Sequence, residues 1–156
     1  MSAREQHVLF ICTGNVCRSF MAEVLLNDLA AKRKLPLIAK SCGVAAERYF
    51  EVPPGVWKAL EPRGLAPRLH TAQLVSRDLL DWADIALGMT HAHCDFVLDA
   101  YPEFSAKVRP FAAYCRLPEL DIDDPIGRPD AVFQSCCGRI AGGLEGLLKR
   151  LSSGPS

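Results

Sequence analysis

The sequence predicts an α/β domain built on a mainly parallel sheet. Short apolar runs with β-branched residues alternate along the chain with segments whose apolar residues recur at helical spacing. The 156 residues are enough for one core of ordinary size, and no internal repeat, low-complexity tract or long linker divides them. We therefore expect a single domain, 1–156, with its packed core over about 7–151 and a frayed tail over 152–156.

The first half of the chain contains two predicted strands and two predicted helices. Residues 7–12 are a nearly continuous apolar run, which is typical of a strand buried on both faces. The helical spacing of apolar residues predicts a helix over 21–34, and a second short strand is expected over 37–39. A helix over 56–61 ends before Pro62, because proline cannot continue it.

The second half continues the alternation. Residues 84–89 form another apolar strand pattern, and Thr90 is a suitable N-cap for the segment after it. A weaker strand pattern covers 107–111, and a polar loop over 120–130 leads to a last helix over 131–151. In parallel sheets ligands bind beyond the carboxyl ends of the strands, so the loop after the first strand is where we expect a site.

Charge and composition exclude several function classes. Lys plus Arg and Asp plus Glu are both 18, so no overall basic field attracts nucleic acid or a membrane surface. No apolar run approaches the roughly 20 residues that span a bilayer, and the first residues lack the pattern of a secretory signal. The seven cysteines are odd in number, which favours reduced thiols in a cytoplasmic protein over a disulfide framework.

The loop after the first strand has the residue types that a phosphate-binding cysteine nucleophile needs. A free thiol must become a thiolate, and unpaired N–H groups at a helix N-terminus stabilise that anion and hold phosphate oxygens. Gly14 and Asn15 allow the backbone turns that bring successive N–H groups inward. The segment comprises Cys12, Thr13, Gly14, Asn15, Val16, Cys17, Arg18 and Ser19.

Two further side chains of this loop fit phosphoryl transfer. Five residues separate Cys12 from Arg18, so one turn of loop brings both to the same anion. The planar guanidinium can hold two phosphate oxygens at once, and charge spreads over such oxygens in the transition state. Ser19 can donate its hydroxyl to the thiolate.

A proton donor for the leaving oxygen is expected in the polar loop. Asp124 precedes Pro125, which restricts its backbone to extended conformations and suits a loop that presents one carboxyl group. Asp124 would protonate the leaving group and then act as base on the attacking water. Asp121 and Asp123 are competing candidates, but neither precedes proline.

These motifs resemble the low-molecular-weight protein tyrosine phosphatase family, in its bacterial branch that includes protein arginine phosphatases. The resemblance implies a four-stranded parallel sheet flanked by helices on both faces, with no metal and no other cofactor. It also implies that Cys12 is the nucleophile, that Arg18 binds phosphate, and that Asp124 is the general acid. Cys17 would be the redox partner that protects Cys12 through a reversible disulfide. The matching segments are 12–19, 21–23, 41–44, 70–73, 83–84, 89–91 and Asp124-Pro125.

Departures from the family pattern bear on the substrate. Phe20 stands where the family has proline, and Ile126 stands where an aromatic residue commonly packs on the substrate ring. Val16 occupies a position that is typically threonine in the arginine phosphatases, and valine has no hydroxyl. We expect hydrolysis of phosphotyrosine in proteins through a phosphocysteine, with phosphoarginine as the alternative substrate. Tyr49 and Phe50 are expected to line the pocket with Val16 and Ile126.

Other interpretations need different residues. An arsenate reductase would need a disulfide relay from Cys12, for which Cys94 and Cys115 are the mid-chain pair. A phosphate-binding module without activity would not need nucleophile, arginine and acid together. A metal site at 91–94 has no fourth ligand at suitable spacing. His70 either orients the loop through a hydrogen bond or is a structural histidine elsewhere.

Overall fold

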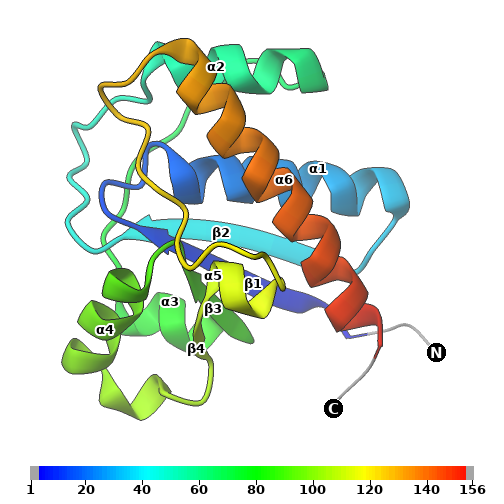
Figure 1. Cartoon of the computed structure of the whole chain (residues 1–156). Coiled ribbons are helices and arrows are strands. Elements are labelled where there is room, and N and C mark those ends of the chain that lie inside the picture. Colours follow the sequence, from blue (N-terminus) through cyan, green and yellow to red (C-terminus); the bar gives the residue numbers. More distant parts are fainter. Residues whose placement is uncertain (1–3, 154–156) are drawn as a thin grey trace.

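Four parallel strands form the sheet at the centre of the structure, a computed structural model that describes residues 4–153 (Figure 1). Its strand order is β2-β1-β3-β4. Because β2 and β3 lie on opposite sides of β1, the chain reverses its direction of winding at the carboxyl end of β1, where such folds bind ligands. The strands are β1 (Gln6–Cys12), β2 (Leu37–Gly43), β3 (Ile85–Gly88) and β4 (Val108–Pro110).

Helices cover both faces of the sheet, with α1, α2 and α6 over one face and α3 and α4 over the other (Figure 1). Alternate residues of β1 enter two separate buried clusters: Phe10 lies with α1 and α6, and Leu9 lies with α3 and α4. This arrangement confirms the predicted four-stranded α/β fold. The helices are α1 (Arg18–Arg33), α2 (Pro54–Leu60), α3 (Arg77–Trp82), α4 (His91–Ala100), α5 (Phe111–Tyr114) and α6 (Asp130–Ser152), with short 3₁₀ turns at Glu61–Arg63 and Pro102–Phe104.

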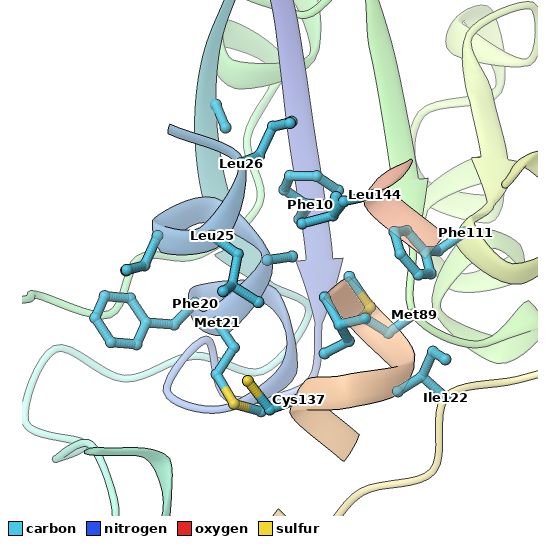
Figure 2. Close-up of a cluster of buried hydrophobic side chains, with 14 of the residues drawn as sticks. Phe10, Phe20, Met21, Leu25, Leu26, Met89, Phe111, Ile122, Cys137 and Leu144 are labelled. Carbon is cyan, nitrogen blue, oxygen red and sulfur yellow. The ribbon is translucent and has the colours of Figure 1, made fainter. Parts of the chain in front are cut away.

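The larger cluster fills the space between the sheet, α1 and α6 (Figure 2). Phe10 meets Phe111 edge to face, with ring centroids 6.0 Å apart. Ile122, which precedes the predicted acid loop residue by two positions, is fully buried in this cluster, and its N–H donates to Met89 O at 2.9 Å. The core thus fixes the start of a segment that otherwise runs along the surface.

The predicted elements differ from the observed ones mainly at their ends. Helix α1 begins at Arg18, three residues before the predicted start, and β2 continues to Gly43. The short helices α3 and α5 were not expected, because each spans too few residues for a helical pattern to show. The predicted frayed tail over 152–156 begins too early, because Ser152 is still the last residue of α6. Residues 154–156 lie outside the described residues. No helix within 4–153 is long and apolar enough to cross a membrane.

The end of β2 lies directly against the loop after β1. Val44 N donates to Cys12 O and Ala45 N donates to Thr13 O, both at 2.9 Å. A Cβ on Gly43 would lie 2.3 Å from Thr13 O, so only glycine allows the two backbones to approach this closely. The shape of the loop therefore depends on the neighbouring strand.

We expect Gly43→Ala to lower the free energy of unfolding by roughly 1–3 kcal/mol, as overpacking does, and to displace the backbone of the loop after β1 at Thr13. Gly138→Ala is the matched control, because nothing lies within 4 Å of a Cβ there, on the exposed side of α6. The control should gain up to about 1 kcal/mol from helix propensity. Urea unfolding of the three proteins measures both effects; equal stability of G43A and wild type would contradict the close approach.

Candidate active site

The predicted loop connects the end of β1 to the N-terminus of α1, at the carboxyl edge of the sheet (Figure 1). Cys12 ends the strand, Cys17 is the N-cap position and Arg18 begins the helix. No acidic side chain lies in the first turn of α1, so the positive end of the helix dipole is not neutralised there. Cys12 and Arg18 are 2% and 4% exposed. The loop thus holds a thiol and a guanidinium together in a nearly buried place.

Asn15 holds the loop in its turned conformation. Its φ is 61°, in the left-handed region, and it is fully buried. Its Nδ2 donates to Ser19 Oγ at 2.9 Å and to Ser41 Oγ at 2.8 Å, and its Oδ1 accepts from Gln73 N at 3.0 Å. His70 Nε2 lies 2.7 Å from Asn15 O. The hydrogen bond from His70 settles the alternative left open by the sequence: this histidine contacts the loop.

Ser19 contacts the thiol of Cys12, with Oγ and Sγ 2.9 Å apart. The same hydroxyl lies 3.2 Å from Cys42 O, to which it can donate when Cys12 is a thiol. Because the hydroxyl has one proton, ionisation of Cys12 turns that proton toward sulfur, where it stabilises the anion. Asn15 donates to the serine oxygen in both states and keeps it in place.

The guanidinium of Arg18 leaves one edge without partners. Its NH1 donates to Ile122 O at 3.0 Å, whereas NH2 has only long contacts, 3.4 Å to Thr13 Oγ1 and 3.6 Å to Asp124 Oδ2. The Nε of Arg18 is buried and has no hydrogen-bond partner within residues 4–153. A buried donor without a partner is costly, so the Nε–NH2 edge is suited to two oxygens of a bound anion.

The polar loop brings one of its three aspartates to this edge. Asp124 lies 3.6 Å from Arg18, and its Oδ1 accepts from Ile126 N at 3.1 Å, which shapes the turn. Asp121 instead accepts from His91 N at 2.8 Å, and the hydrogen bond from the His91 side chain lowers the pKa of that carboxyl. Of these aspartates, Asp124 is the one in contact with the arginine.

The predicted pocket residues fall into two groups. Val16 is buried and packs with Ala46, Ala72 and the partly buried Phe50, which also lies over Gly14. Tyr49 is 77% exposed, with its ring 5.1 Å from that of Phe50 in an edge-to-face arrangement, and Ile126 is half exposed on the acid loop. A hollow of about 540 Å³ adjoins this cluster, lined by Ala46, Glu47, Arg48, Thr71, Ala72, Gln73 and Leu74.

The remaining cysteines are free and buried. Burial raises the pKa of the Cys17 thiol well above its ordinary value. Cys94 and Cys115 lie in the clusters on opposite faces of the sheet, so the pair considered for an arsenate relay is not brought together.

Within 4–153, no three His, Cys, Asp or Glu side chains are grouped to hold a metal ion; His91 and His93 contact Asp121 and Thr90 instead.

Some contacts of the site were not predicted from the sequence. His93 reaches Thr13 from α4, and the backbone carbonyl of Ile122 binds Arg18. Ser41 connects Asn15 to Glu23: its hydroxyl accepts from Asn15 Nδ2 and donates to Glu23 Oε1 at 2.7 Å. The Thr-x-x-His pattern at the start of α4 is a signal for a helix cap, but nothing in it points to residue 13.

Comparison with known proteins decides the family. The family model "Low molecular weight phosphotyrosine protein phosphatase" matches residues 7–154. The chain belongs to this family. A protein-arginine-phosphatase of Geobacillus stearothermophilus is 33% identical to this phosphatase over 93% of each chain. The low molecular weight protein-tyrosine-phosphatase YfkJ of Bacillus subtilis is 31% identical over 90% of this chain and 92% of its own.

The fold agrees with the same assignment. The crystal structure of a low molecular weight protein tyrosine phosphatase from T. tengcongensis matches this phosphatase with a TM-score of 0.89 and 31% identity, over 94% of this chain and 99% of that one. The resemblance seen in the sequence is therefore confirmed, and the protein is a cysteine-based phosphatase.

We expect Asn15→Ala to destabilise this phosphatase more than Asn15→Gly. Both variants lose the hydrogen bonds of the amide and must adopt the φ of 61°, but only alanine has a Cβ that makes this conformation unfavourable, by roughly 1–2 kcal/mol. Chemical denaturation measures the difference between the two variants. If they were equally stable, the left-handed conformation would not be a constraint on this loop.

Proposed function

We propose that this phosphatase hydrolyses phosphotyrosine in proteins through a phosphocysteine on Cys12, with Asp124 as general acid and base. The observation that carries the proposal is the buried edge of Arg18. The Nε of Arg18 has no hydrogen-bond partner within 4–153, and Arg18 belongs to the same 12–19 segment as the Cys12 thiol. A phosphate group pairs with that edge through two oxygens, which places phosphorus beside the sulfur nucleophile.

In the first step the Cys12 thiolate attacks phosphorus. The sulfur–phosphorus bond forms as the bond to the ester oxygen breaks, and Asp124 gives its proton to that oxygen. The loop N–H groups and Arg18 stabilise the charge on the equatorial phosphate oxygens. Asp124 is 43% exposed at the rim, where a leaving group can reach it.

The second step regenerates the enzyme. The Asp124 carboxylate takes a proton from water, whose oxygen attacks phosphorus while the sulfur–phosphorus bond breaks. The electron pair returns to Cys12 sulfur, and the Ser19 hydroxyl 2.9 Å away stabilises the thiolate. Inorganic phosphate then leaves the loop.

The surface beside the loop supports a protein substrate with an aromatic group. Phe50 lies over Gly14, and Tyr49 and Ile126 are exposed apolar side chains. An aryl ring gains contact with such side chains while its phosphate enters the loop. The substrates proposed are phosphorylated proteins, and nucleic acid and membranes are not proposed as partners.

Phosphoarginine is the second candidate, because a relative at 33% identity is named a protein-arginine-phosphatase. The mechanism is unchanged, with a phosphorus–nitrogen bond broken in place of the ester bond. Val16 argues against this substrate, since its methyl groups pack among Ala46 and Ala72 and it lacks the hydroxyl that is typical of the arginine phosphatases at this position.

We also propose that Cys17 is the redox partner of Cys12. A peroxide would oxidise Cys12 to a sulfenic acid, and the Cys17 sulfur would then form a disulfide with release of water. Burial keeps Cys17 protonated until that event, because it raises the pKa of the thiol. The need to keep Cys12 reduced favours the cytoplasm as the compartment.

We expect Cys12→Ser to abolish turnover of an aryl phosphate, because a serine hydroxyl in this loop has no base to activate it. Asp124→Ala should lower kcat by roughly a hundred- to ten-thousand-fold, the usual contribution of a general acid. Asp123→Asn is the matched control, because this exposed neighbour lies outside the proposed machinery, and it should keep the wild-type rate. Steady-state kinetics measures all three; a wild-type rate in C12S would overturn the mechanism.

The substrate is tested with phosphotyrosine and phosphoarginine peptides of the same sequence. Wild type should favour the tyrosine peptide, and Val16→Thr should raise the arginine reaction by roughly two- to tenfold, the worth of one hydrogen bond. Val16→Ala is the control, because it changes the packing without adding a hydroxyl. A preference of wild type for phosphoarginine would make the second candidate the function.

A further inference from the structure

His93 crosses from α4 to the phosphate-binding loop. Its Nε2 lies 2.9 Å from Thr13 Oγ1, which in turn lies 3.4 Å from Arg18 NH2. The side chain is 5% exposed, and 80 residues of sequence separate it from Thr13. A buried histidine therefore contacts the arginine proposed to bind phosphate, through one hydroxyl.

The hydrogen bonds at the start of α4 set which ring nitrogen carries the proton. Thr90 N donates to His93 Nδ1 at 3.1 Å, so Nδ1 is an acceptor and has no proton. Burial and the positive charge of Arg18 lower the pKa of His93 to about 4, so the ring is neutral at pH 7. Its single N–H is then on Nε2 and donates to Thr13 Oγ1.

This donor orients the Thr13 oxygen. With one lone pair occupied by His93, the other can accept from Arg18 NH2. The competing partner of NH2 is the Asp124 carboxylate, at 3.6 Å. A full ion pair with Arg18 would stabilise the ionised carboxylate and oppose its use as a proton donor. Acceptance by Thr13 keeps the guanidinium edge turned toward the loop.

We propose that His93 is a positioning residue for the reaction: through the Thr13 hydroxyl it fixes the Arg18 guanidinium in the orientation that binds the phosphate of the substrate. The inference rests on the role proposed above for Arg18. It assigns to α4 a part in catalysis beyond the cap that His93 makes with Thr90.

Two substitutions at His93 separate positioning from capping. Asparagine places an acceptor near Nδ1 and keeps the cap, but it cannot reach Thr13. Glutamine places an amide N–H near the position of Nε2 and can still donate to Thr13, but it has no acceptor at the position of Nδ1 and loses the cap. Binding of inorganic phosphate by calorimetry and kcat/KM for an aryl phosphate are measured for each variant, together with thermal unfolding.

His93→Asn should weaken phosphate binding and lower kcat/KM by about tenfold each, the effect of one mispositioned charged hydrogen bond. His93→Gln should stay within about threefold of wild type, although it loses the cap and should unfold at a lower temperature than H93N. Thr13 gives the same contrast, since Thr13→Ser keeps the hydroxyl and Thr13→Val removes it. In the T13V background H93N should add no further loss, because the bridge is already gone.

Equal losses in H93N and H93Q, wild-type phosphate binding by H93N, or a full H93N loss in the T13V background would each overturn the positioning role. Arg18→Ala distinguishes this failure from failure of the proposed function. If R18A binds phosphate as wild type does, the phosphate-binding role proposed for Arg18 and its loop is wrong. If R18A loses binding and H93N does not, only the role of His93 is wrong.

Discussion

The buried positive charge of Arg18 is the constraint on which the rest of the site depends. A guanidinium that is 4% exposed must recover the solvation it has lost, and a carbonyl, a hydroxyl and a carboxylate at the rim supply only part of this. The Nε remains without a protein partner within 4–153. In the proposed function a phosphate dianion would complete the charge balance, so an arrangement that is costly to the fold alone would favour substrate binding.

Each part of the fold around Arg18 holds one of its neighbours. The close approach of β2 and the amide of Asn15 fix the loop that contains Cys12 and Thr13. The core holds Ile122, whose carbonyl binds the arginine and whose position brings Asp124 to the rim. Figure 2 shows Ile122 beside Met89 at this end of the core. The proposed nucleophile and phosphate binder share one loop, and the proposed acid, which is distant in sequence, meets them at one edge of the sheet.

The sequence was sufficient for the fold and for the position of the loop that follows β1. The apolar runs predicted the strands, and the order of residues 12–19 indicated the loop, because its chemistry depends on neighbours in the chain. It was not sufficient where tertiary contacts decide. His70 was left between two alternatives, and the contact of His93 with Thr13 was not predicted, since both depend on how helices and loops pack. The early start of α1 follows from the loop, which turns directly into the helix at Arg18.

The central claim is that phosphate captured beside Arg18 is transferred to the sulfur of Cys12. The most direct test is to quench the enzyme with acid during turnover of an aryl phosphate and to locate phosphoryl groups by mass spectrometry. A phosphoryl group should be found on Cys12 of the wild type. With 4-nitrophenyl phosphate, whose leaving group needs no proton, it should accumulate in Asp124→Ala, because hydrolysis of the phosphocysteine then lacks its base. A burst of phenol release without phosphoryl on Cys12, or with phosphoryl on another residue, would contradict the account.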